Sequence, residues 1–117
     1  MTSLYDLKKQ IEKDPQYWAI HLMDFVDDFR YYKDTTALIK PFDEMNDRWA
    51  ALLAAVVETL AKEMNLSIPD WIYLVPAVKD PWFVSGMENL KAIALTESPL
   101  PFRRRKIFVM ENFLSRV

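Results

Sequence analysis

The chain has 117 residues, of which 51% are hydrophobic and 27% charged, and its formal net charge is −2 at pH 7. This composition is typical of a folded globular protein and excludes an intrinsically disordered one. With no cysteine and one glycine, the sequence also excludes disulfides, thiolate metal sites, cysteine nucleophiles and glycine-rich phosphate loops. The length predicts a single domain, residues 1–117, and the periodicity described below predicts that it is helical.

The amino terminus lacks the continuous apolar segment of a secretory signal. The longest uncharged apolar run, residues 49–57, is far shorter than the roughly 20 residues that span a bilayer. The lack of cysteine is typical of a reducing compartment. We therefore expect a cytoplasmic protein without a membrane partner.

Two amphipathic helices are predicted first. Thr2 or Ser3 caps a short helix that continues to about Lys13, with Asp6 completing a capping box to Ser3. A second helix opens at Pro15 and runs to about Lys33, because proline is favoured at the first helical position. Its predicted buried stripe is Trp18, Leu22, Phe25, Val26 and Phe29.

A connector with one helical turn is expected over residues 34–41, and Phe42 is expected to anchor it to the core. The clearest helical periodicity then extends from Asp43 to Met64, with Asn65 as a left-handed stop. Alanines on this helix allow neighbours to approach closely, which predicts the central, most buried helix. Its apolar stripe is Met45, Trp49, Leu52, Leu53, Val56, Val57, Leu60 and Met64.

Prolines at 69, 76 and 81 leave room for one short helix, near Pro69–Val75, in an otherwise irregular segment. A capping box predicts the next helix at about 86–95, and for residues 102–117 helix and short strand both stay open. The predicted fold is all-α, an orthogonal or irregular bundle of about five helices. The capping box is Ser85 with Glu88, and the inner face of that helix is Met87, Leu90, Ile93 and Ala94.

The only histidine, His21, shares a helix face with Asp24 and Asp28, a spacing that can place three metal ligands. These residues lie off the predicted core stripe, so an exposed helix face is the favoured interpretation. No serine stands in a nucleophile-elbow context beside this histidine. We expect no catalytic residue, no metal and no cofactor.

Residues 60–71, LAKEMNLSIPDW, imitate a helix-turn-helix, yet the second segment offers no basic or amide side chains for reading bases. An ordinary helical corner is therefore favoured. Basic residues predominate in the C-terminal 20 residues, whereas acidic ones predominate in residues 1–70. This asymmetry predicts a candidate partner-binding or anion-binding surface, and its residues are Arg103, Arg104, Arg105, Lys106, Trp82, Phe83 and Phe102.

Two alternatives apply to that surface. Some of the arginines are expected to pair with carboxylates of the first three helices, in preference to binding nucleic acid directly. The aromatic pair Trp82 and Phe83 either anchors a partner or packs under the bundle.

From Asp24 onward the chain resembles an uncharacterised family of short bacterial helical proteins. The resemblance lies in PWFVSGMENLKAIALTESPLPFRRRKIFVMENFLSRV at residues 81–117 and in LAKEMNLSIPDWI at residues 60–72. It implies a companion of nucleotidyltransferase-like toxins and brings no catalytic residue with it. The matching positions are Pro81, Trp82, Phe83, Glu97, Ser98, Pro99, Phe102, Arg103, Arg105, Ile107 and Phe108.

The leading hypothesis is a non-enzymatic, antitoxin-like interaction protein with a protein partner. A nucleic-acid-binding regulator with a degenerate helix-turn-helix is the alternative, followed by an enzyme with converging carboxylates or arginines from different helices. A homo-oligomer stays open.

Overall fold

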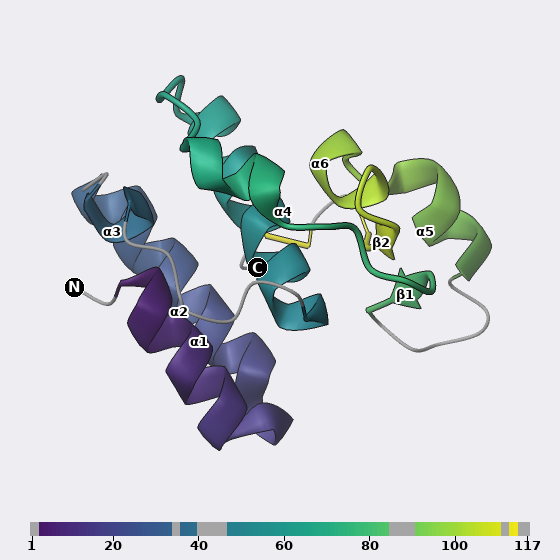
Figure 1. Ribbon diagram of the computed structural model, residues 1–117, viewed down its shortest axis with the longest axis horizontal. Helices are drawn as coiled ribbons and strands as arrows, with labels where there is room; N and C mark the ends of the chain where they lie inside the picture. Colours follow the sequence, from purple (N-terminus) through teal and green to yellow (C-terminus); the bar gives the residue numbers. More distant parts are fainter. Residues whose placement is uncertain (1–2, 34–35, 40–46, 85–90, 111–112, 115–117) are drawn as a thin grey trace. The chain divides into compact units, whose positions relative to one another are not determined.

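A computed structural model of the chain describes residues 3–33, 36–39, 47–84, 91–110 and 113–114. These residues form two compact units, the first up to residue 39 and the second from residue 47, and each is described by itself. They are mostly helical, with one small two-stranded parallel sheet, which confirms the all-α class (Figure 1). That the whole chain is one domain stays a prediction. No described helix is both long and apolar enough to cross a membrane.

The first unit contains the helices α1 (Leu4–Lys13) and α2 (Trp18–Tyr32), which pack against each other (Figure 1). Ser3 caps α1 as predicted, since its Oγ accepts a hydrogen bond from the Asp6 N–H at 3.2 Å. A 3₁₀ turn, η1 (Pro15–Tyr17), precedes α2 where the proline predicted a helix start. The fully buried apolar side chains of α1 and α2 are Leu4, Leu7, Ile11, Leu22, Phe25, Val26 and Phe29.

Both ends of α2 are less buried than its middle, and Trp18 is the one residue of the predicted stripe that is not buried. Tyr31 and Tyr32 are 79% and 60% exposed and contact each other edge to face, and Trp18 at the other end is only half-buried. Lys33 then ends the helix in the left-handed conformation, with φ of 54°. The predicted connector contains one helical turn, α3 (Thr36–Ile39), while Phe42 lies outside the described residues.

The second unit is built on α4 (Arg48–Glu63), whose buried run from Ala50 to Glu58 confirms the prediction of a central, deeply buried helix. The predicted start at Asp43 is wrong. Asp47 has an extended backbone, and its Oδ1 accepts a hydrogen bond from the Ala50 N–H at 2.8 Å, so it is the N-cap.

The other end of α4 agrees with the sequence. Asn65, with φ of 56°, adopts the left-handed conformation expected of a helix stop. Met45, the first residue of the predicted stripe, lies outside the described residues, and Trp49 and Met64 are half-buried rather than buried. Between them the stripe is completely buried.

Between α4 and the sheet, the only regular segment in residues 64–81 is η2 (Asp70–Leu74), a 3₁₀ helix where one short helix was expected. It packs against α4 and buries Trp71 and Ile72. The chain then forms β1 (Trp82–Phe83).

The C-terminal part contains α5 (Lys91–Glu97), α6 (Leu100–Arg103) and β2 (Ile107–Phe108), so both the helix and the strand left open by the sequence are present. α5 ends at Glu97, two residues beyond the approximate end predicted at Leu95. The next residue, Ser98, precedes Pro99, where helical geometry is disfavoured.

The inner face predicted for α5 is only partly correct. Ala94 is buried, whereas Ile93 is 40% exposed. The other members of that face, Met87 and Leu90, and the capping box of Ser85 and Glu88 lie outside the described residues.

The sheet joins β1 and β2 in parallel, with Trp82 opposite Ile107 and Phe83 opposite Phe108. Ser98 fastens β2 to the end of α5. Its buried Oγ donates to the Ile107 carbonyl and accepts from the Val109 N–H, both at 3.2 Å. Ser98 therefore fixes β2 against the end of α5, while backbone hydrogen bonds pair β2 with β1.

Candidate functional site

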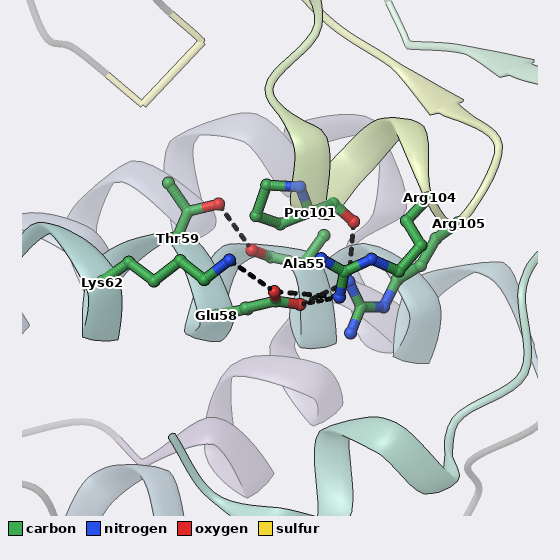
Figure 2. A network of polar contacts seen from close by, with 7 residues as sticks. All are labelled: Ala55, Glu58, Thr59, Lys62, Pro101, Arg104 and Arg105. Carbon is green, nitrogen blue, oxygen red and sulfur yellow. Dashed lines mark hydrogen bonds and ion pairs between the residues drawn. The ribbon is translucent and has the colours of Figure 1, made fainter. Parts of the chain in front are cut away.

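A cluster of charged side chains surrounds Glu58 on α4, whose side chain is 1% exposed (Figure 2). Arg105 Nη1 donates to Glu58 Oε1 at 2.9 Å, and Arg104 Nη1 donates to both carboxylate oxygens at 3.2 and 3.0 Å. Lys62 Nζ lies 3.1 Å from Oε2. One buried carboxylate is thus bound by three cations, which we call the Glu58 cluster.

Local structure brings these groups together. Lys62 follows Glu58 by four residues, one turn along the same face of α4. Arg104 and Arg105 lie directly after α6, which packs against α4. Arg105 Nη1 also donates to the Pro101 carbonyl of α6 at 2.6 Å, so its buried guanidinium caps the end of α6 while it binds the carboxylate (Figure 2).

The electrostatics of the cluster favour an ionised Glu58. Burial by itself raises the pKa of this carboxyl group, but hydrogen bonds from Arg105 and Lys62 and the charges of Arg105 and Arg104 outweigh it. The pKa of Glu58 therefore lies below its ordinary value. Near neutral pH a carboxylate held in this form lacks the proton of a general acid, and its lowered basicity and three cationic partners make it a poor general base.

The remaining two basic residues of the predicted surface are exposed. Arg103 Nη2 donates to the Thr96 carbonyl and to the Ser98 carbonyl, both at 3.0 Å, so its guanidinium is held against the end of α5. Lys106 has a left-handed backbone, with φ of 62°, at the turn between α6 and β2. Its exposed ammonium group has no partner among the residues described.

Three aromatic side chains of the predicted surface occupy different environments. Phe102 is fully buried and contacts Phe113 edge to face. Phe83 is half-buried, stacks on Phe108, and has the ammonium of Lys91 5.2 Å from its ring centre. Trp82, also half-buried, meets Trp49 edge to face at 5.4 Å. The pair at 82 and 83 therefore packs partly on the unit and stays partly accessible.

Burial corrects two members of the predicted surface. Arg105 is 5% exposed and Phe102 is completely inaccessible, so neither side chain is available to a partner in this structure. Arg105 is buried because its charge is neutralised by Glu58, and Phe102 because the apolar face of α6 packs on α4. Some of the arginines were expected to pair with carboxylates of the three helices predicted first. Arg104 and Arg105 do so with Glu58, which lies on the third of these helices, α4 in the structure.

The sequence-based candidates omitted Glu58 and a groove near β1. The groove, with a volume of about 300 Å³, is lined by Arg48, Val78, Lys79, Asp80, Pro81 and Trp82. Glu58 could have been noticed as a lone carboxylate in an apolar helix stripe. The groove had no such signal, because Arg48 lies at least 30 positions before the other lining residues.

The candidate metal and DNA-reading motifs look different in the structure. Within the described ranges no three acidic, histidine or cysteine side chains are grouped to hold a metal, and His21 Nε2 lies 3.8 Å from Asp14 Oδ2. The second segment of the helix-turn-helix pattern is the 3₁₀ helix η2, with five residues and no basic side chain. The ordinary corner was therefore the correct interpretation of residues 60–71.

In comparisons with known proteins, no protein-family model, curated protein or solved structure matches the chain. The family resemblance of residues 60–72 and 81–117 stays a prediction.

Glu58→Gln tests the energetic role of the cluster. The substitution leaves the buried Arg105 guanidinium without a carboxylate, so we expect the free energy of unfolding to fall by about 3 kcal/mol. Urea denaturation followed by circular dichroism measures it. The matched control is Glu63→Gln, an exposed glutamate on the same helix, which should change stability by less than about 0.5 kcal/mol. Equal effects of the two substitutions would contradict the role of Glu58.

The pH dependence of stability follows from the lowered pKa of Glu58. Since the folded-state pKa is below the unfolded-state value, the unfolded chain binds the proton more readily. The cluster's contribution is therefore complete above the ordinary glutamate pKa and is lost as the pH falls through the folded-state pKa. The stability difference between the wild type and Glu58→Gln should shrink on going from about pH 7 to about pH 3. A constant difference over this range would refute the assignment.

Proposed function

We propose that the chain is a non-enzymatic interaction module that binds an acidic protein partner through the basic turn, defined as Leu100, Arg103, Arg104 and Lys106. The observation that carries the proposal is that Arg103 and Arg104 are exposed and yet held in fixed positions by internal hydrogen bonds. Such preorganised arginines lose little side-chain entropy when a partner binds.

The donors that remain on these arginines suit carboxylates of a partner. A guanidinium carries five N–H donors, and the recorded hydrogen bonds of Arg103 use only Nη2, while those of Arg104 use only Nη1. In the described part of the chain the other guanidinium nitrogens have no recorded acceptor. They can therefore bind a carboxylate without breaking the contacts that orient the side chains.

An apolar side chain accompanies these charges. Leu100 is 58% exposed, and its carbonyl accepts a hydrogen bond from the Arg104 N–H at 2.9 Å, so the two residues are one helical turn apart on the same face. Arginine beside an apolar contact is a frequent combination at the energetic centres of protein interfaces. Lys106 adds a further exposed positive charge to the turn.

The chemistry of the cluster favours a binding role over a catalytic one. Glu58 is ionised and paired with Arg104, Arg105 and Lys62. These internal contacts account for the buried carboxylate, so no substrate is needed to explain it. The family resemblance suggests the finer proposal that the partner is a nucleotidyltransferase-like toxin and that this chain is antitoxin-like.

The test is a double charge reversal, Arg103→Glu with Lys106→Glu, which leaves the buried Arg105 intact. We expect binding to the protein encoded by the adjacent gene to weaken by at least about tenfold, because like charges then face an acidic surface. Isothermal titration calorimetry measures the affinity. The matched control, Lys13→Glu with Lys33→Glu, makes the same change of net charge on exposed lysines of the first unit and should bind as the wild type does.

Two results would contradict the proposal: full affinity in the Arg103 and Lys106 variant, or no binding by the wild-type chain. A third measurement addresses the alternative partner class. If wild-type protein retards duplex DNA with a steep salt dependence that the double variant loses, the basic turn binds nucleic acid and the protein-partner proposal is wrong.

A further inference from the structure

The groove beside β1 contains an arginine held between two tryptophans. The Arg48 guanidinium lies 4.8 Å from the centre of the Trp82 ring and 5.3 Å from that of Trp49, and the two rings are almost perpendicular, at 89°. The cation is therefore fixed in an aromatic corner. Its five N–H donors have no carboxylate partner in the ranges that the structure describes.

Two more charged side chains line the same groove. Lys79 and Asp80 are exposed, and no ion pair or hydrogen bond of either side chain is recorded among the described residues. With Arg48 they give the groove a formal charge of about +1 at neutral pH. A monoanion balances this charge, whereas a dianion such as a phosphate monoester would also be repelled by Asp80.

The rest of the lining is apolar. Val78, Pro81 and the ring of Trp82 form this part of the wall, and the volume of about 300 Å³ is at the lower limit of small-molecule sites. An aromatic or aliphatic body of modest size therefore fits beside the charged groups. Asp80 adds an acceptor for one N–H or O–H group of a ligand.

From this arrangement we propose that the groove binds a small organic monocarboxylate with an apolar body and one hydrogen-bond donor. Arg48 and Lys79 bind the carboxylate, Trp82 and Val78 contact the body, and Asp80 accepts the hydrogen bond of the donor. The inference goes beyond the proposed protein interface. Arg48 is ten residues before Glu58 on α4, which separates the two positions by about 15 Å along the helix.

The probe is N-acetyl-L-phenylalanine, which combines a carboxylate, an amide N–H and an aromatic ring. Its uncharged amide, N-acetyl-L-phenylalaninamide, has the same body and tests the carboxylate alone. Calorimetry and tryptophan fluorescence on the full chain should show binding of the acid at least about tenfold tighter than binding of the amide, which is the contribution of a charged hydrogen-bonded pair.

Two variants locate the binding. Arg48→Gln and Lys79→Gln should each weaken binding of the acid, the first by about tenfold or more, and leave the amide's affinity unchanged. Lys79 is exposed and lies outside helices and strands, so its replacement should not disturb the fold. The Lys79→Gln variant therefore tests the groove even if Arg48→Gln disturbs the start of α4. Lys13→Gln is the matched control, an exposed lysine of the first unit, and it should bind the acid as the wild type does.

Three results would overturn the inference. These are equal binding of acid and amide by the wild type, full affinity for the acid in both groove variants, or displacement of the acid by inorganic phosphate at a similar concentration, which indicates an unselective anion site. A measurement with a peptide then distinguishes the two sources of a carboxylate, a small molecule and the C-terminus of a polypeptide. If a tetrapeptide ending in phenylalanine binds about tenfold tighter than the probe, the groove recognises a chain terminus and the small-molecule assignment is wrong.

Discussion

The second unit depends on the neutralisation of one buried carboxylate. Glu58 lies within a continuous buried run of α4, where an isolated charge is strongly disfavoured. Arg104 and Arg105 make its burial tolerable, and in doing so they fix the segment after α6 to α4. A buried ion pair of this kind adds little net stability compared with apolar packing, but it is demanding in geometry. The cluster therefore specifies where the C-terminal segment lies.

The contacts of Arg104 and Arg105 with Glu58 also position the residues that pair with the segment before β1 and with β1 itself. The Arg105 carbonyl accepts a hydrogen bond from the Val78 N–H at 3.2 Å, and the Lys106 carbonyl accepts one from the Trp82 N–H at 2.9 Å. The strand pairing thus begins at Lys106, directly after the two arginines that bind Glu58. Through Trp82 the same constraint reaches the groove and Arg48, so both proposed binding surfaces rest on one frame.

The sequence motif behind the family resemblance acquires a physical interpretation. Several of its residues are structural: Ser98 fastens β2, Phe102 and Ile107 are completely buried, and Arg105 neutralises Glu58. These residues make internal contacts that stabilise the fold of the second unit. Arg103, by contrast, combines a fixed position with exposure, and so it is the motif residue best suited to contact a partner.

Local signals predicted the helices well. Periodicity and capping gave α1, α2, the central position of α4 and its left-handed stop at Asn65, because these depend on neighbouring residues. The start of α4 was missed because Asp43 and Asp47 are both acceptable caps by sequence. Pairs distant along the chain could not be predicted, since no local pattern links Glu58 with arginines more than 40 positions later.

Amide hydrogen exchange in the wild type and in Glu58→Gln tests the central claim most directly. If the Glu58 cluster positions the C-terminal segment, the variant loses protection first at three N–H groups. Those of Trp82 and Val84 donate to carbonyls in that segment, and that of Val109 lies in the segment and donates to Ser98. The amides of α1 and α2 keep their protection. Unchanged protection at those three amides, or an equal loss throughout both units, would contradict the account.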